Sequence, residues 1–235
     1  METPAESQLS SKEAAGVEAA LCVESGMKIG LGTGSTVTFF LEALARRIQS
    51  EGLVVKGVAT SEATVLKAKE LGIPMATLEE EPRLDLVIDG ADEVDGDFRL
   101  IKGGGGALLR EKIVAAAGER VVIIVGEGKQ VETLGTTFLL PVEILPFGYL
   151  STEIKVAELG CIPFLRTTET EGPFVTDNGN YILDCKFPDG IADPVSLHAE
   201  LSQIPGVAEV GLFLDLCDEV ITGLAGGEAT TQVKP

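Results

Sequence analysis

The stretch from residue 89 to residue 112, DGADEVDGDFRLIKGGGGALLREK, decides how the rest of the chain is interpreted. The apolar run Leu86-Val87-Ile88 comes directly before it and predicts a buried strand. Asp89 and Asp92 follow where this strand should end. Ligands in open α/β sheets bind beyond the carboxyl ends of the strands, so we expect both carboxylates to lie at a ligand-binding edge of a sheet.

A run of four glycines, Gly103 to Gly106, follows Lys102 and leads into a helix-forming segment that begins at about Ala107. Glycine costs roughly 0.5–1 kcal/mol relative to alanine in regular structure, so such a run indicates positive φ angles or close approach of a ligand to the backbone. A flexible linker is the alternative, but linkers rarely open directly into a helix. Glycine loops before helices bind anions through N–H groups. With Glu111 in the second turn of the helix, the stretch predicts proton transfer beside a bound anion.

A second glycine loop, Gly32-Thr33-Gly34-Ser35-Thr36, follows a predicted strand over residues 28–31. The next segment has the apolar periodicity of a helix with one buried face, at Val37, Phe40, Leu41, Leu44 and Ile48. Strand, glycine–hydroxyl loop and helix is the layout of a phosphate site. The loop lacks the ending of a Walker A motif and the third glycine of a dinucleotide fingerprint. We therefore predict phosphate binding at Ser35 and Thr36, although either residue could also cap the helix.

Composition and charge exclude several classes of protein. The 235 residues include 18 Lys+Arg and 37 Asp+Glu, and the net charge of −19 argues against binding to nucleic acid or to an anionic membrane. The four scattered cysteines predict free thiols in a reducing compartment. The chain has no apolar run of membrane-spanning length, and the N-terminal METPAESQ lacks signal-peptide features. These features predict a cytoplasmic protein, with disordered tails at METPAESQ and GGEATTQVKP.

No metal or organic cofactor is predicted. The cysteines form no zinc motif, and aligning Gly96 with the invariant glycine of an EF-hand loop puts Ala91 and Lys102 at ligand positions, which excludes a calcium loop. His198 is the only histidine and lies away from both glycine loops, so acid–base chemistry is expected to depend on carboxylates or lysines.

The order of elements predicts two domains. Up to about residue 130 strands alternate with helices, which predicts a parallel sheet covered on both faces. The expected elements there are helices over 10–25 and 62–71 and strands over 53–60, 73–77, 84–89 and 121–125. From 131 the order βαββαβ is ferredoxin-like. Its expected elements are strands over 141–144, 161–166, 173–187 and 207–214 and helices over 147–159 and 194–204. The segment 173–187 is expected to be broken by a turn at Asp177-Asn178-Gly179-Asn180. Residues 218–224 are expected to return to the first sheet, so the domains are 1–130 plus 215–235 and 131–214.

The segments GLGTGSTV, DGADEVDGDFRLIKGGGGALLREK and VTDNGNYILD together resemble the type A family of ribose-5-phosphate isomerases, and the similarity runs from Lys12 to about Gly223. The resemblance implies a Rossmann-like α/β domain with a smaller ferredoxin-like α+β domain, usually as a homodimer or homotetramer. It implies interconversion of ribose 5-phosphate and ribulose 5-phosphate, a step of the pentose phosphate pathway, without a cofactor.

The resemblance also implies a role for each matching residue. Glu111 matches the proton-shuttling base, and Asp89 and Asp92 match the carboxylates that hold the sugar and assist ring opening. Lys102 and the N–H groups of Gly103, Gly104 and Gly105 match the group that stabilises the enediolate. The remaining substrate contacts match Lys12, Thr33, Gly34, Ser35, Thr36, Gly90, Ala91 and Lys129. Lys12 would otherwise be interpreted as a surface charge. The chain departs from the family at Gly128, where many members carry a serine.

Two other classes of function are considered. A non-catalytic sugar-phosphate sensor would keep the phosphate loop but need not keep Glu111 together with Lys102. An acyl or CoA transferase would use a glutamate as nucleophile and would usually be a longer chain.

Overall fold

The computed structural model describes residues 4–169 and 172–235. Contacts divide the chain into two compact units. The first comprises Met1–Ala91, Arg110–Lys129 and Asp215–Pro235, and the second comprises Asp92–Leu109 and Gln130–Leu214. Residues 92–109 thus group with the second unit, whereas the sequence analysis assigned them to the first. Within the described ranges, no helix combines the length and hydropathy needed to cross a membrane.

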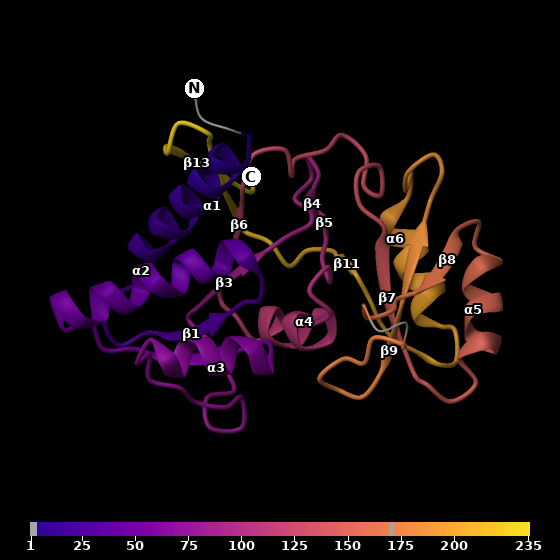
Figure 1. Ribbon diagram of the computed structural model, residues 1–235, viewed down its shortest axis with the longest axis horizontal. Helices are drawn as coiled ribbons and strands as arrows, with labels where there is room; N and C mark the ends of the chain where they lie inside the picture. Colours follow the sequence, from indigo (N-terminus) through magenta and orange to yellow (C-terminus); the bar gives the residue numbers. More distant parts are fainter. Residues whose placement is uncertain (1–3, 170–171) are drawn as a thin grey trace. The chain divides into compact units, whose positions relative to one another are not determined.

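The first unit contains a six-stranded sheet in the order β13-β12-β6-β3-β1-β2 (Figure 1). Its strands are β1 (Lys28–Leu31), β2 (Lys56–Ala59), β3 (Leu86–Gly90), β6 (Val121–Val125), β12 (Glu219–Gly223) and β13 (Ala229–Val233). Its helices are α1 (Pro4–Leu21), α2 (Ser35–Glu51), α3 (Glu62–Glu70) and most of α4 (Leu108–Ala116). All strand pairs are parallel except β12 with β13. The predicted Rossmann-like parallel sheet is confirmed, including the return of residues 218–224.

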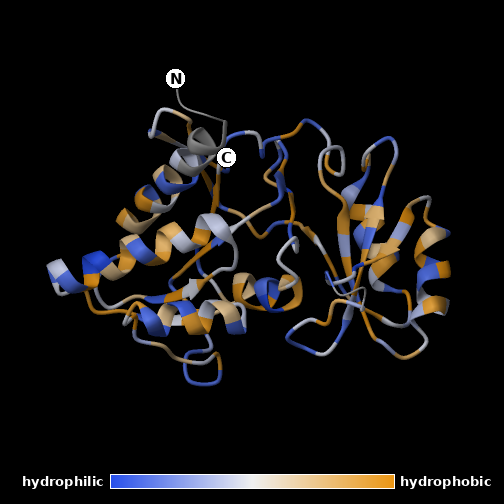
Figure 2. Ribbon diagram, in the orientation of Figure 1, coloured by the Kyte–Doolittle hydropathy of each residue, from blue (hydrophilic) through white to orange (hydrophobic). Residues whose placement is uncertain are grey.

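Both faces of this sheet are buried, as the apolar strands require. Helices α1 and α2 lie side by side and pack against β3, β6 and β12 (Figure 1). Alternate strand residues share the core cluster with these helices, namely Ile29, Leu31, Leu86, Ile88, Val122, Ile124 and Ile221. The intervening residues, such as Val87 and Ile123, are equally buried and point to the opposite face. Hydrophobic and hydrophilic segments alternate along α2, which buries its predicted apolar face (Figure 2).

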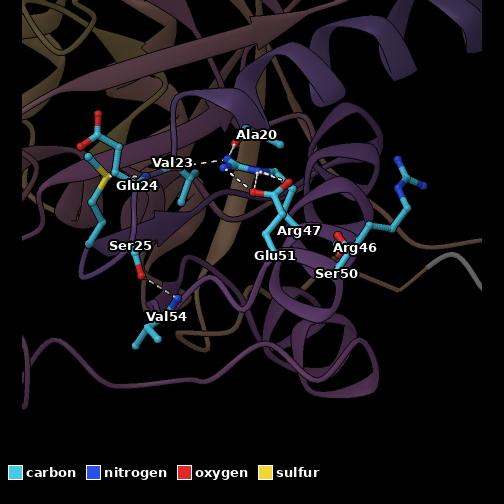
Figure 3. A network of polar contacts seen from close by, with 10 residues as sticks. Ala20, Val23, Glu24, Ser25, Arg46, Arg47, Ser50, Glu51 and Val54 are labelled. Atoms are coloured by element: carbon cyan, nitrogen blue, oxygen red, sulfur yellow. Dashed lines mark hydrogen bonds and ion pairs between the residues drawn. The ribbon is translucent and has the colours of Figure 1, made fainter.

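Helix α1 ends at Leu21 rather than at residue 25 as predicted. Arg47 of α2 explains the earlier end, because its Nη1 donates to the carbonyl oxygens of Ala20 and Val23, the latter at 2.9 Å (Figure 3). These carbonyls lie at the end of the helix, where intrahelical donors run out. Arg47 is itself held by Glu51, and both the Nη2 and Nε groups reach that carboxylate at 3.0 to 3.2 Å.

The second unit contains a four-stranded antiparallel sheet in the order β10-β7-β9-β8. Its elements run β7 (Leu140–Ile144), α5 (Tyr149–Ala157), β8 (Ile162–Leu165), β9 (Tyr181–Lys186), α6 (Pro194–Ser202) and β10 (Val207–Val210). This order confirms the predicted ferredoxin-like βαββαβ pattern. A separate three-stranded sheet joins β4 (Glu93–Val94), β5 (Leu100–Ile101) and β11 (Leu212–Phe213).

Four predictions of local structure were wrong. Residues 4–8 of the expected N-terminal tail begin α1, while residues 1–3 lie outside the described range. The expected C-terminal tail contains β13, which pairs with β12 along its whole length. Residues 73–77 form only one bridge, between Gly57 and Met75. Residues 173–176, expected as a strand, form only one bridge, between Thr167 and Pro173. The predicted turn at Asp177-Asn178-Gly179-Asn180 is present, and the Thr176 hydroxyl accepts the N–H groups of Asn178 and Asn180 at 3.3 and 3.2 Å.

Candidate functional site

Asp89 connects two loops at the carboxyl edge of the parallel sheet. It lies near the end of β3, is 1% exposed, and its Oδ1 accepts the N–H groups of Thr33 at 3.0 Å and Gly90 at 2.7 Å. Gly32 makes this contact possible, since a Cβ there would overlap the Asp89 carboxyl group. The predicted grouping of Asp89 with the loop after β1 is therefore present, and the aspartate is fixed in one orientation.

The loop after β1 is held by a cluster of hydroxyl groups. The Thr33 hydroxyl lies 2.7 Å from that of Thr60 and 2.8 Å from that of Ser61. Thr64 closes the cluster by donating to the carbonyl of Gly32 at 2.8 Å. Ser61 also caps the N-terminus of α3, since its hydroxyl accepts the Thr64 N–H. The sequence analysis missed Thr60 and Thr64, which no motif marks.

Helix α2 presents its N-terminus beside this loop. Its N-cap is Gly34, with φ of 123° and no capping bond from a side chain of the described residues. Neither Ser35 nor Thr36 is therefore the N-cap of α2. Ser35 is exposed and Thr36 is partly exposed in the first turn. Hydroxyl donors, N–H groups at a helix start and the positive end of the helix dipole together favour an anion.

Lys12 and Lys129 belong to the same unit. Lys12 lies on α1 next to the loop after β6, where a Cβ on Gly126 would come within 3.3 Å of its Cγ. Lys129 lies three residues after Gly126 and is partly buried. Strands β6, β3 and β1 are adjacent and parallel, so their following loops emerge at one edge of the sheet. That edge therefore carries the N-terminal glycine loop, Asp89 and the loop that leads to Lys129. Gly90 is the last residue of β3, and Ala91 follows it.

In the second unit, Asp92 binds the C-terminal glycine loop. Its Oδ2 accepts the N–H of Gly104 at 2.8 Å, and its own N–H donates to Ile101 at 2.8 Å. A Cβ on Gly104 would come within 2.7 Å of the Asp92 Oδ1, so a larger residue would displace the carboxylate. Gly104 and Gly105 are exposed. Asp92 therefore holds the glycine backbone at this point of the loop.

Lys102 is a buried cation at the start of this loop. It is 3% exposed, its N–H donates to Gly211 at 2.9 Å, and its Nζ lies 5.3 Å from the centre of the Phe213 ring. An ammonium over an aromatic face is stabilised by the ring quadrupole. Gly103 and Gly106 flank the loop with φ of 105° and 80°, backbone angles that favour glycine.

Glu111 lies in the first turn of α4 and is 4% exposed. The sequence analysis placed it in the second turn because it began the helix at Ala107 rather than at Leu108. A buried carboxylate is costly to maintain without a purpose, and such groups concentrate at functional sites.

Glu93 is a supporting residue that the sequence analysis did not single out. It is fully buried, and its Oε1 accepts the N–H groups of Thr137 and Phe138 at 2.6 and 2.7 Å, while Oε2 accepts that of Gly135 at 2.5 Å. Phe138 in turn lies beside Gly104, within 3.0 Å of the position of a Cβ there. Within the described part of the chain, no group of three or more His, Cys, Asp or Glu side chains could hold a metal ion.

Comparisons with known proteins agree over nearly the whole chain. The family model for ribose 5-phosphate isomerase A (phosphoriboisomerase A) matches residues 56–227. Ribose-5-phosphate isomerase A 1 of Oceanobacillus iheyensis is 51% identical over 212 residues, covering 90% of this chain and 93% of that protein.

Solved structures give the same result. Ribose 5-phosphate isomerase A of Methanocaldococcus jannaschii superposes with a TM-score of 0.90 at 40% identity, covering 95% of this chain and 98% of that one. A D-ribose-5-phosphate isomerase in complex with phospho-erythronic acid has a TM-score of 0.91 at 36% identity, covering 99% of this chain and 100% of that one. The chain therefore belongs to the ribose 5-phosphate isomerase A family, a family of aldose–ketose isomerases.

Proposed function

We propose that this protein interconverts D-ribose 5-phosphate and D-ribulose 5-phosphate through an enediolate, with Glu111 as the only group that transfers the carbon-bound proton. The observation that carries the proposal is the buried Glu111 carboxylate, which lies in the first turn of the helix after a glycine loop in a chain of this family. A carboxylate shielded from water can remove a proton from one carbon and return it to the next.

The reaction requires three operations in sequence. Asp89 and Asp92 hold the sugar hydroxyls and assist opening of the ring. Glu111 then removes the proton from C2 of the open-chain aldose, and the electrons move into the C1 carbonyl to give an enediolate. The hydroxyl proton of O2 transfers to O1, and Glu111 returns its proton to C1, which gives the ketose.

The enediolate oxygen needs preorganised donors. Lys102 and the N–H groups of Gly103 to Gly105 supply them, and one such donor contributes up to roughly 3–4 kcal/mol to a developing oxyanion. A solved relative is bound to phospho-erythronic acid, whose carboxylate resembles the planar oxyanion of an enediolate, and this supports an enediolate intermediate.

The phosphate anchors the other end of the sugar. Ser35, Thr36 and the first N–H groups of α2 supply donors, and Lys12 and Lys129 supply positive charge. These local cations are needed because the net charge of −19 repels an anionic substrate. Anchoring also lowers the entropic cost of aligning the sugar with Glu111.

We also propose that the protein acts as a homodimer or homotetramer. Helix α5 supports this, because Leu150 and Ile154 lie one turn apart and are 59% and 62% exposed, and nearby Phe147 is 94% exposed. Contiguous exposed apolar side chains of this kind are typical of protein–protein contacts. Light scattering would measure the mass, and a monomer at micromolar concentration would contradict the proposal.

A coupled assay for ribulose 5-phosphate tests the activity. The wild-type protein should form the ketose from ribose 5-phosphate, and Glu111→Gln should lose at least ~10² in kcat while still binding substrate. Binding without turnover in the wild type would indicate a sugar-phosphate sensor instead. A hydroxylamine-sensitive acyl-enzyme would indicate a transferase.

A further inference from the structure

The carbonyl side of the glycine loop is bound by an arginine that the proposed reaction does not use. Arg166 follows β8, and its Nη1 donates to the carbonyl oxygens of Gly103 at 2.9 Å and Gly104 at 3.2 Å. The side chain is 15% exposed. These contacts lie entirely within the second unit.

The guanidinium is held by its surroundings on several sides. The carboxylate of Asp184 in β9 accepts two hydrogen bonds from Arg166, from Nε to Oδ2 at 2.9 Å and from Nη2 to Oδ1 at 2.6 Å. This leaves Nη1 for the glycine carbonyls. The backbone of Arg166 is fixed as well, because it donates to Ile182 and accepts from Phe174, both at 2.8 Å. The Phe174 ring lies 5.7 Å from the guanidinium carbon. Two parallel hydrogen bonds and a stacked ring fix the plane of the side chain.

This contact helps to set where the glycine N–H groups point, together with the Gly106 N–H, which donates to the Gly103 carbonyl at 3.0 Å. The described part of the chain contains no cis peptide bonds, and in a trans peptide the N–H points opposite to the C=O. With the carbonyls of Gly103 and Gly104 directed at Arg166, the N–H groups of Gly104 and Gly105 are directed away from it. The first of these reaches the Asp92 carboxylate at 2.8 Å. A cation on the carbonyl also polarises the peptide and strengthens its N–H as a donor.

We propose that Arg166, fixed by Asp184, is a positioning residue that orients and polarises the Gly105 peptide as a donor to the enediolate, while the Gly104 N–H holds the Asp92 carboxylate. The inference rests on the proposed function. Arg166 acts through the glycine backbone and does not touch the substrate. Four glycines in succession have little conformational preference of their own. Arg166 adds to the bond between the Gly106 N–H and the Gly103 carbonyl in selecting one orientation of these peptides.

Lysine cannot replace arginine in this role. An ammonium is a compact point charge, and it cannot bind both carboxylate oxygens of Asp184 and the two carbonyls in a fixed plane. Arg166→Lys keeps the charge and most of the packing, so it tests positioning separately from folding. Arg166→Ala opens a space that added guanidinium can fill.

The test compares both variants with the wild type, using kcat, KM and the dissociation constants of phospho-erythronate and inorganic phosphate. We expect kcat to fall by about tenfold or more in both variants, since loss of one oxyanion donor costs roughly 10²–10³ and misorientation costs part of that. KM and phosphate affinity should change less than about threefold, while phospho-erythronate affinity falls in parallel with kcat. Millimolar guanidinium should restore part of the activity of Arg166→Ala.

Arg99→Ala provides the matched control. Arg99 lies in the same unit and binds Asp95 at 2.7 Å and Asp97 at 2.6 Å, so its loss also breaks an arginine–carboxylate pair. Its kcat should remain within about twofold of wild type, because neither Asp95 nor Asp97 belongs to the candidate site. Wild-type kcat in Arg166→Lys, or an equal loss of phosphate and phospho-erythronate affinity, would overturn the inference. An inactive wild type would instead contradict the proposed function.

Discussion

Two carboxylates of the candidate site differ in side-chain length and in position, and this difference separates their roles. Asp89 accepts two backbone N–H groups on one oxygen and has a short side chain, so it is suited to holding a hydroxyl group in place. Glu111 has a longer side chain at the start of a helix, which suits a group that must serve two adjacent carbons. The division of labour proposed here follows from these local restraints.

The phosphate end provides a prediction at the same scale. Replacing both Ser35 and Thr36 with alanine should raise KM for ribose 5-phosphate by roughly tenfold or more, because each hydrogen bond to a charged group contributes about 1.5–3 kcal/mol. Turnover of free ribose, which has no phosphate, should hardly change. Steady-state kinetics with the two sugars separates the cases, and an equal loss for both would indicate a folding defect.

Elements with strong patterns could be predicted from the sequence. The run Val121–Val125 and the capped helix at Asp193-Pro194 lie where they were expected, with Asp193 accepting the Ser196 N–H at 3.1 Å. Strands β4 and β5 could not be predicted, because each has two residues and the segment between them is rich in aspartate and glycine. Strand β13 was missed because its polar sequence forms a strand only through pairing with β12.

The residues of the candidate site show the same contrast between those that belong to a sequence motif and those that do not. The residues with motifs were found, whereas Thr60, Thr64, Glu93 and Arg166 act through contacts with backbone groups distant in sequence. A single sequence carries no signal for such contacts, because they depend on where separate loops meet in the folded chain.

The amino ends of β1 and β2 carry a charge cluster that predicts how stability depends on pH. The Glu81 carboxylate pairs with two ammonium groups: its Oε1 lies 2.6 Å from Lys56 Nζ, and its Oε2 lies 2.9 Å from Lys28 Nζ. Hydrogen bonds from Lys56 and then Lys28 lower the pKa of Glu81 below its ordinary value of 4.5. A carboxylate with a lowered pKa stabilises the folded state above the unfolded value, and this contribution is lost as pH falls through the folded value.

Glu81→Gln should therefore lower the free energy of unfolding at pH 7, and this loss should be smaller at pH 3, which lies below the ordinary pKa of 4.5. Urea unfolding at both values measures the effect. Asp85 does not serve as a control because it binds the Lys28 N–H, so Glu79→Gln, an exposed change in the same loop, is the matched variant. An equal loss at both pH values would show that Glu81 contributes by packing rather than by charge.

At the scale of the whole molecule, the types of side chain that the sequence offers predict a reaction that needs no metal ion. The chain has one histidine and scattered cysteines, and its clustered side chains are carboxylates and lysines, so protons and hydrogen bonds must carry the reaction. Activity should survive exhaustive treatment with EDTA. Loss of activity on chelation, with recovery on adding a divalent ion, would contradict this expectation.

The central claim is that one group, Glu111, transfers the carbon-bound proton. Its most direct test is deuterium incorporation into the sugar when ribose 5-phosphate is incubated with enzyme in heavy water. We predict that Glu111→Gln lowers exchange in step with kcat, by at least ~10², while Asp89→Asn and Asp92→Asn weaken binding or ring opening and keep part of the exchange from the open-chain sugar. Exchange at the wild-type rate in Glu111→Gln, with none in Asp89→Asn, would instead identify Asp89 as the base.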